Sequence, residues 1–386
     1  MESKMRSSYV RYLQSIFAAG AVVALFFFAF VAWVGEKSGA TMLPEDMGAV
    51  QSLNAEIVVE PFDLHYWAAM KIQRIAHDQP EVVSIGSSRG HEMRSAMFRP
   101  YRFYNASLTA WTLKQEIEMV DRVTSVSKPR VIIIGLDYSM LVDQLAAALN
   151  AERTMQFENG VRYRYRSSLA ALKTIVSQPI LLSALWNEKR DTIPHFIGLH
   201  AFQTATGFRF DGSRMMPRTV YQAAPSYLAR NIGQLDAVPG APHVDPGQLS
   251  ELERLAKLAK DRNVLLVAIQ YPIYKASVDY LDKEPSYQFY SGVWRDFQSN
   301  EMLSRLRNLG IIFFDLTRTE MTSDGRYFTD AAHPTEAGIS VAISDLLRDE
   351  RFRRIFPAID PERLRADRGK AAARGDAFEI YDNDQR

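Results

Sequence analysis

Residues 82–90 of this chain are Val-Val-Ser-Ile-Gly-Ser-Ser-Arg-Gly. The apolar run 82–85, closed by Gly86, predicts a buried strand that ends in a tight turn. Residues 113–126 predict a helix, and residues 131–135 (VIIIG) predict a second buried strand. A strand, a helix and a strand in this order indicate two parallel neighbours in one sheet.

The same alternation resumes after residue 249. Residues 264–269 (VLLVAI) and 311–314 (IIFF) predict two further buried strands, and helices are expected at 250–260, at 295–309 and after Pro334. Four near-continuous apolar strands that alternate with helices favour an α/β fold. We expect a doubly wound parallel sheet between two helical layers, a three-layer sandwich.

The composition of the chain excludes several classes of site. Of 386 residues, 47% are hydrophobic and 24% are charged, as in ordinary globular proteins. The net charge of +1 and the lack of a basic cluster interleaved with aromatic residues argue against a nucleic-acid partner. The chain has no cysteine, so disulfides, zinc–thiolate sites and cysteine nucleophiles are excluded. No metal-ligand spacing or phosphate-binding glycine loop is present, and we expect no metal or cofactor.

Residues 16–35 form an uncharged apolar run near the N-terminus. Twenty helical residues span about 30 Å, the thickness of a bilayer core, and Trp33 lies where an interfacial aromatic residue is expected. A cleaved signal peptide usually has a shorter apolar region of about 7–15 residues, so we favour a retained anchor. Three basic residues and one acidic residue precede the run, and the positive-inside rule therefore places residues 1–15 in the cytoplasm.

The rest of the chain is then expected outside the cytoplasmic (inner) membrane. Residues 36–61 are irregular and predict a stalk, and residues 62–356 carry the α/β domain. Residues 141–249 interrupt the alternation of strands and helices and predict an insertion or cap of helices and loops. Residues 357–386 are rich in Arg, Asp and Ala with little apolar periodicity, and we expect a charged tail there, either a solvated helix or disordered.

A serine follows the first core strand. In a tight turn between a strand and a helix, the hydroxyl of Ser88 is exposed, and backbone N–H groups at the helix start can bind an oxyanion. Function in parallel sheets concentrates at the carboxyl ends of the strands, where this turn lies. Glycine and serine are also common in such turns, and serine is a good helix cap. The turn alone therefore does not distinguish a nucleophile from a cap.

Residues 328–338 (FTDAAHPTEAG) follow the last predicted strand and start the last helix. Asp330 precedes His333 by three residues on one loop, and this spacing lets the carboxylate orient the imidazole and stabilise its protonated form. On its own, the motif is explained more simply by a turn cap and a surface histidine. Together with a serine at the end of the first strand, it predicts a serine-hydrolase triad of Ser88 as nucleophile, His333 as base and Asp330 as its orienting acid.

This pattern resembles the SGNH (GDSL-like) hydrolase superfamily, in which the nucleophilic serine follows the first core strand and Asp-x-x-His precedes the last helix. Residues 86–88 (GSS) are most similar to its membrane-tethered branch, which includes the D-alanyl-lipoteichoic acid biosynthesis protein and periplasmic polysaccharide O-acetyltransferases. The resemblance runs from about residue 82 to residue 347, without residues 141–249. It implies the same three catalytic roles, and it matches residues 104–107 (YNAS) to the family's second block.

Three positions depart from the family pattern. Ser87 replaces the aspartate that usually precedes the nucleophile, and Ala110 lies where a glycine N–H is expected in the oxyanion site. The asparagine expected after the strand at 131–135 is missing. One oxyanion donor is therefore unaccounted for, and the loss of such a donor costs about 10²–10³ in rate. The candidates for oxyanion or substrate binding are Asn105, the Ala110 N–H and Arg89.

Residues 86–90 also match the Gly-x-Ser-x-Gly elbow of α/β-hydrolases. In that fold several strands precede the nucleophile, and the acid and the histidine lie on separate loops. Here Ser88 follows the first core strand, and Asp330 and His333 share one loop. We therefore favour the first interpretation over the α/β-hydrolase fold.

The predicted triad implies acyl transfer through a covalent ester on Ser88. Water as acceptor makes an esterase, and a sugar hydroxyl makes an O-acyltransferase. The resemblance implies an acyl-ester donor, a glycan acceptor in the cell envelope or in a secreted polysaccharide, and a multi-pass membrane acyltransferase as partner. The departures in the oxyanion set support an alternative, an inactive domain that binds glycan or acts as a scaffold in an exopolysaccharide machine.

Overall fold

A computed structural model describes residues 2–53, 56–157, 160–179, 195–216, 220, 241–283, 290–376 and 378–381. All strands of its main sheet are parallel, in the order β3 (Phe103–Ser107), β2 (Val82–Gly86), β4 (Val131–Gly135), β8 (Leu265–Gln270) and β9 (Ile312–Asp315). The four strands expected from apolar runs are confirmed, and β3 adds a fifth at one edge.

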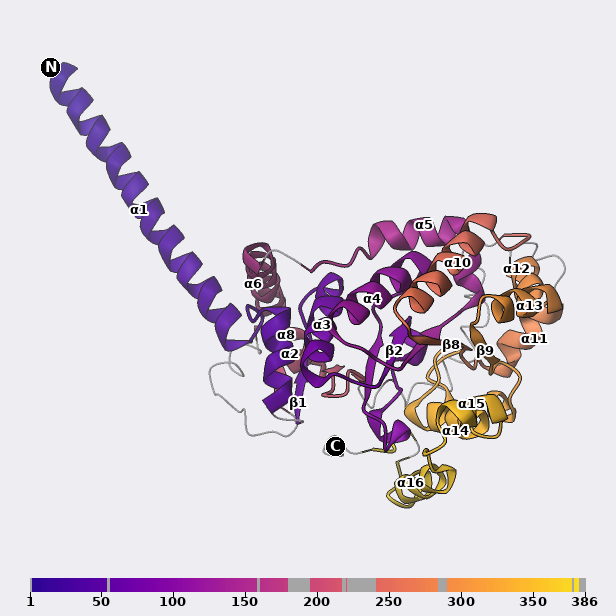
Figure 1. Ribbon diagram of the computed structural model, residues 1–386. Coiled ribbons are helices and arrows are strands. Elements are labelled where there is room, and N and C mark those ends of the chain that lie inside the picture. Colours follow the sequence, from indigo (N-terminus) through magenta and orange to yellow (C-terminus); the bar gives the residue numbers. More distant parts are fainter. Residues whose placement is uncertain are drawn as a thin grey trace.

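Side chains along these strands alternate between two apolar cores. Ile85 and Ile134 belong to the first core, whereas Val82 and Ile133 belong to the second. The first core also takes residues from α3 (Trp67–Asp78), α4 (Leu113–Val126), α10 (Pro246–Asp261), α12 (Tyr290–Phe297) and α13 (Asn300–Asn308); the second takes residues from α14 (Glu336–Leu346), α15 (Glu350–Ile355) and α16 (Pro361–Ala373). Figure 1 shows α4 and α10 above the sheet and α14 and α15 below it. Burial on both faces explains why these strands are near-continuous apolar runs.

Two helices differ from their predicted bounds because of polar caps. α10 begins at Pro246, before the expected start, because the side chain of Asp245 accepts hydrogen bonds from the N–H groups of its first turn. The single helix expected at 295–309 is in fact α12 and α13, since Ser299 caps a new N-terminus between them.

A second sheet joins the segment after the apolar run to the predicted insertion. Its strands follow the order β5 (His195–Ile197), β1 (Ile57–Val59), β6 (Gly207–Phe208) and β7 (Arg214–Met215). Residues 36–61 are therefore not the irregular stalk that we expected: α2 (Pro44–Leu53) packs on α3, and Met47 and Val59 are fully buried. The reason is a long-range one, because β1 finds its parallel partner only in the insertion.

The insertion at 141–249 contributes helices as well as strands. The helices that the structure describes here are α5 (Asp143–Glu152), α6 (Gly160–Ser177) and α8 (Leu199–Thr204). Residues 180–194, 217–219 and 221–240 of the predicted insertion lie outside the described residues. α11 (Lys275–Lys283) follows β8 and leads on to α12.

The N-terminal apolar run lies in one long helix, α1 (Glu2–Lys37), which projects away from the rest of the molecule (Figure 1). Part of it, Tyr9–Lys37, is long and apolar enough to cross a membrane. Its side chains are exposed from Tyr9 to Phe30, and burial begins at Val31. The helix therefore leaves the domain close to Trp33, at the end of the predicted span.

The C-terminal segment forms the helix that was one of the two expectations, α16, but this helix is docked on the domain and not solvated on all sides. α16 buries Leu364 and Ala371, and beyond it Ile380 and Tyr381 are 3% and 4% exposed. Only two positions of α16 are buried, so its sequence carries little apolar periodicity. The backbone N–H groups of Ile380 and Tyr381 donate to one carboxylate oxygen of Glu336 on α14, at 2.8 and 2.7 Å.

Buried Arg94 joins this tail to the rest of the domain. Its guanidinium donates to Asp211 in the insertion at 3.1 Å, to Glu336 at 2.9 Å and to the backbone oxygen of Tyr381 at 3.2 Å. Arg94, Asp211 and Glu336 are all 2% exposed or less. One cation therefore satisfies groups from three segments that are distant in the sequence.

The packing of α16 predicts that Leu364→Ala lowers the free energy of unfolding by about 2–5 kcal/mol, because it leaves a cavity beside the second core. Leu53→Ala on α2 is the matched control, since Leu53 is 81% exposed and has little packing to lose. Urea unfolding of the full chain in detergent measures both changes. Equal effects of the two substitutions would contradict the docking of α16.

Candidate active site

The carboxyl end of β2 places Ser88 in a half-buried turn. β2 ends at Gly86, whose φ of 147° lies in the region that favours glycine, and a Cβ there would lie 3.1 Å from the backbone nitrogen of Gly135 on β4. Ser87 caps the turn by accepting a hydrogen bond from the N–H of Arg89. The chain after β2 thus forms a single 3-10 turn, Ser88–Gly90, with the candidate nucleophile as its first residue.

The loop before α14 brings Asp330 and His333 to the same place. Nε2 of His333 lies 2.7 Å from Ser88 Oγ, and Nδ1 lies 2.9 and 2.8 Å from the two carboxylate oxygens of Asp330. With the Nδ1 proton donated to Asp330, Nε2 is left to accept the proton of Ser88. The three residues that the sequence singled out therefore form one continuous hydrogen-bonded series.

Backbone hydrogen bonds hold this loop in shape. Oδ1 of Asp330 accepts the N–H groups of Ala332 and His333 at 2.8 and 2.9 Å, and the N–H of Thr329 donates to the backbone oxygen of His333 at 2.9 Å. Burial alone would raise the pKa of Asp330, but hydrogen bonds from the His333 ring and from the backbone lower this pKa to about 2. Asp330 is therefore ionised near neutral pH, as an orienting carboxylate must be.

A buried carboxylate fixes the turn on both sides of Ser88. Asp137, at the carboxyl end of β4, accepts a hydrogen bond from Ser87 Oγ at 3.2 Å and from the Arg89 guanidinium at 2.8 Å. Burial raises the pKa of Asp137, and the charge of Arg89 opposes that rise. The sequence alone does not reveal this role of Asp137, because only the parallel pairing of β2 and β4 brings the two strand ends together.

The turn after β3 also binds the turn of Ser88. The N–H groups of Leu108, Thr109 and Ala110 donate to the backbone oxygens of Ser87 and Gly86 at 3.2–3.3 Å. The Ala110 N–H, predicted as an oxyanion donor, is thus already used to hold the backbone before Ser88.

Asn105 is likewise engaged. Its Nδ2 donates to the backbone oxygens of Gly90 and Met93 at 2.9 and 2.8 Å, and its Oδ1 accepts the N–H of Ser107 at 2.8 Å. The structure therefore corrects the predicted oxyanion set: Asn105 and Ala110 position the chain around Ser88, and Arg89 pairs with a buried carboxylate. Polar groups that the sequence pattern assigned to the site are here hydrogen-bonded to neighbouring parts of the chain instead.

One backbone donor remains at the nucleophile. Within the described part of the chain, the N–H of Ser88 has no hydrogen-bond acceptor. In a serine hydrolase, the N–H groups beside the nucleophile bind the oxyanion. The Ser88 N–H is therefore the oxyanion donor that this geometry supports.

Ser88 and His333 open onto a cavity of about 340 Å³, the size of a small-molecule site. Its other lining residues are His91, Leu108, Arg214, Met216, Val220, Thr329 and Asp330. The His91 ring donates to the backbone oxygen of Ser88 and lies 6.1 Å from the His333 ring. Arg214 comes from the insertion, whose sequence carried no signal that placed it at the site. Among the described residues, no group of three or more His, Asp or Glu side chains is arranged to hold a metal ion.

The low pKa of Asp330 predicts a pH-dependent contribution to stability. Because the folded pKa lies below the unfolded value of about 3.9, the contribution is complete above pH 4 and is lost as the pH falls toward 2. Asp330→Asn should therefore lower the free energy of unfolding by about 2 kcal/mol at pH 6, and by clearly less at pH 3. Urea unfolding at the two pH values measures this, and an unchanged difference would contradict the assigned interaction.

Comparison with known proteins adds no guide to this site. No family model matches the sequence, and no curated protein matches it. What the site does must therefore be inferred from the chemistry of Ser88, His333 and Asp330 themselves.

Proposed function

We propose that this chain is a membrane-anchored serine esterase or O-acyltransferase of the SGNH-like type. The observation that carries the proposal is the series in which Ser88 Oγ lies 2.7 Å from His333 Nε2 and His333 Nδ1 lies 2.8 Å from Asp330. A serine hydroxyl is a weak nucleophile at neutral pH unless a base takes its proton. Here the base and its orienting carboxylate are both within hydrogen-bond distance.

The reaction follows from these contacts. Ser88 Oγ attacks the carbonyl carbon of an ester while His333 takes the hydroxyl proton, and the charge of Asp330 stabilises the resulting imidazolium. The intermediate expels the alcohol, which takes the proton from His333, and leaves an acyl ester on Ser88. An acceptor hydroxyl then attacks this ester, gives its proton to His333 and releases the Ser88 oxygen, which is reprotonated. Water as acceptor yields a free acid, and a sugar hydroxyl yields an acylated glycan.

The order of elements along the chain supports the SGNH-like three-layer fold. The candidate nucleophile follows β2, the first strand of the main sheet in chain order, and Asp330 and His333 share the loop before α14. An α/β-hydrolase would place several strands before the nucleophile and separate the acid from the histidine. The cores on both faces of the parallel sheet are consistent with a doubly wound arrangement.

We propose that α1 holds the domain at the outer face of the cytoplasmic membrane, with residues 1–15 inside. An anchored acyl-transfer domain in this place would meet an acyl-ester donor and a glycan of the cell envelope or a secreted polysaccharide. A multi-pass membrane acyltransferase is the partner that would supply an acyl group from inside the cell. These assignments rest on the resemblance of residues 86–88 and 330–333 to the membrane-tethered SGNH branch.

A specific observation favours a second candidate, a catalytically inactive glycan-binding or scaffold subunit. The Asn105 side chain and the Ala110 N–H are used by neighbouring backbone, so two of the expected oxyanion donors do not face the site. Each missing donor costs about 10²–10³ in rate. Whether Ser88 reacts with an electrophile separates the two candidates.

The nucleophile assignment predicts that the full chain in detergent takes up one equivalent of a fluorophosphonate probe and hydrolyses p-nitrophenyl acetate. Ser88→Ala and His333→Ala should each lower both rates by about 10³-fold or more, because they remove the nucleophile or its base. Asp330→Asn should leave weak activity, about 10²–10⁴-fold below wild type, because it disturbs the orientation of His333.

Ser87→Ala is the matched control. Its hydroxyl donates to Asp137 rather than to His333, so the variant should still react with the probe. Loss of labelling in Ser87→Ala but not in Ser88→Ala would show that the wrong serine was assigned. A folded wild-type chain that neither labels nor hydrolyses the ester would favour the scaffold.

The proposed topology predicts which engineered cysteines an impermeant maleimide can reach in intact spheroplasts. The natural chain has no cysteine, so each introduced thiol is the only target. Lys257→Cys, at an exposed position of α10, should be labelled without lysis, and Tyr9→Cys should be labelled only after lysis. Labelling of Lys257→Cys only in lysed cells, or a mature N-terminus near residue 36, would contradict a retained anchor.

A further inference from the structure

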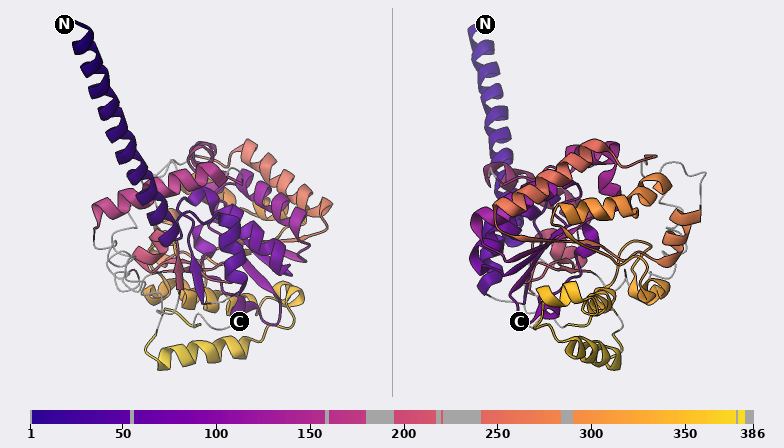
Figure 2. Two further views of the ribbon diagram at one scale, coloured as in Figure 1. Left: turned by 90° about the vertical axis from the view of Figure 1, so that its left-hand side faces the viewer. Right: turned by 45° about the vertical axis from the view of Figure 1, so that its right-hand side comes forward.

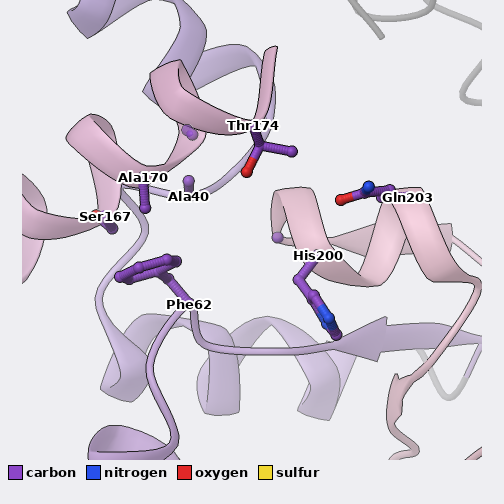
Figure 3. A pocket seen from close by; sticks show the side chains of 9 residues that line it. Ala40, Phe62, Ser167, Ala170, Thr174, His200 and Gln203 are labelled. Carbon is purple, nitrogen blue, oxygen red and sulfur yellow. The ribbon is translucent and has the colours of Figure 1, made fainter. Parts of the chain in front are cut away.

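Helix α6 has one face that packs on the domain. Tyr163 is buried, its ring packs edge-on against Tyr66, and its hydroxyl accepts the N–H of Phe62. Ser167, Ala170 and Thr174 line a small cavity together with Phe62 and His200, and Figure 3 shows them on the side of α6 that faces this cavity. The inner side of α6 is thereby defined by its contacts.

The opposite side of α6 is apolar and exposed. Val161, Tyr165, Leu169 and Val176 are 82%, 61%, 39% and 71% exposed. At about 100° per residue they fall within an arc of about 80° on the helix, roughly opposite the side that faces the cavity. Single exposed apolar residues are ordinary, but an aligned stripe along a whole helix indicates a surface that another phase or molecule covers.

The contact between α6 and the end of α1 indicates that lipid covers the stripe. The end of α1 packs directly on α6, in a cluster that contains Val34, Ala171 and Ile175, with Trp33 against it. Gly35 leaves room at this contact, because a Cβ there would lie 2.5 Å from the methyl group of Thr41 and 3.0 Å from the hydroxyl of Ser168 on α6. Since Trp33 marks the end of the apolar run, α6 lies at the depth of the lipid headgroups when α1 spans the bilayer.

The direction of α6 suits this depth. α6 is seen nearly end-on beside the base of α1 in Figure 1, and in the left view of Figure 2 it runs across that base rather than along α1. A helix that crosses the end of a membrane span lies along the surface of the membrane. Its inner side is taken by the domain, and its apolar side faces away from the domain.

We propose that α6 is an interfacial helix that lies in the outer surface of the bilayer and fixes the orientation of the candidate active site above it. Val161, Tyr165, Leu169 and Val176 would enter the boundary between headgroups and acyl chains. Exposed Arg162 and Lys173 flank the stripe on one side, where they would meet the lipid phosphates. This inference rests on the proposed anchoring by α1, but it does not depend on the chemistry of Ser88.

Two observations favour lipid over another protein as the surface that covers the apolar stripe of α6. The helix that carries the stripe packs against the end of the membrane span, because its buried Ala171 and Ile175 lie in the cluster around Val34. Its basic flank matches the anionic headgroups of a bilayer surface. A protein partner that covers the same stripe is the alternative outcome of the experiment below.

The experiment uses the full chain, which has no natural cysteine, with one thiol introduced and labelled with the environment-sensitive dye NBD. The labelled sites are Tyr165→Cys and Leu169→Cys on the stripe, Phe26→Cys inside the α1 span and Lys257→Cys on distant α10. Each purified variant is reconstituted into nanodiscs of phosphatidylethanolamine and phosphatidylglycerol, with and without a doxyl-labelled phosphatidylcholine. Loss of NBD emission to the doxyl group reports contact with acyl chains.

The proposal predicts blue-shifted emission and a loss of about half of it to doxyl lipid at Tyr165→Cys and Leu169→Cys, with little change at Lys257→Cys. Stripe labels that behave like Lys257→Cys, while Phe26→Cys is quenched, would overturn the interfacial helix and leave the anchor intact. Absence of quenching at Phe26→Cys would overturn the anchoring as well. Since no other protein is present in the nanodiscs, a stripe that stays in water would point to a protein partner.

Discussion

The buried guanidinium of Arg94 is the charge on which the surroundings of the candidate site depend. An unpaired buried charge costs several kcal/mol, so the insertion, α14 and the C-terminal segment must dock together to satisfy it. Arg94 follows the turn of Ser88, and Glu336 follows His333. The ion pair between Arg94 and Glu336 therefore connects the segment after Ser88 with the segment after His333. The tail then completes the arrangement by donating two N–H groups to Glu336. A segment that looks dispensable in the sequence thereby supports the positions of the reactive groups.

The same logic of satisfied buried groups governs the turn of Ser88. Asp137 binds the residues before and after the serine, and the turn after β3 binds the backbone that leads into it. The Asn105 side chain and the Ala110 N–H, which the resemblance assigned to oxyanion or substrate binding, therefore hold the turn of Ser88 instead. The Ser88 hydroxyl is therefore fixed beside the His333 ring, and among the described residues the Ser88 N–H has no acceptor.

The small sheet connects this site to the part of the molecule next to α1. Buried Glu60, after β1, accepts a hydrogen bond from Arg214 in the wall of the active-site cavity and lies 2.7 Å from the ring of His200. His200 lines the second cavity under α6, so one carboxylate bridges the walls of the two cavities. The segment after α1 is therefore a structural link between that helix and the pocket. In the proposed orientation, with α6 on the bilayer surface, this link sets how the pocket stands above the membrane.

The sequence by itself determined four of the five strands of the main sheet, the apolar N-terminal helix and the residues Ser88, Asp330 and His333. Each of these is a local signal: an apolar run, or polar side chains at fixed spacing on a strand end or one loop. Only the tertiary structure decided the roles of Asp137, Asn105 and Ala110, the docking of residues 36–61 and of the tail, and the place of Arg214. These depend on which segments become neighbours through parallel strand pairing and on how buried charges find partners. Neither is encoded in any short stretch of chain, because each of these contacts joins segments that are distant in the sequence.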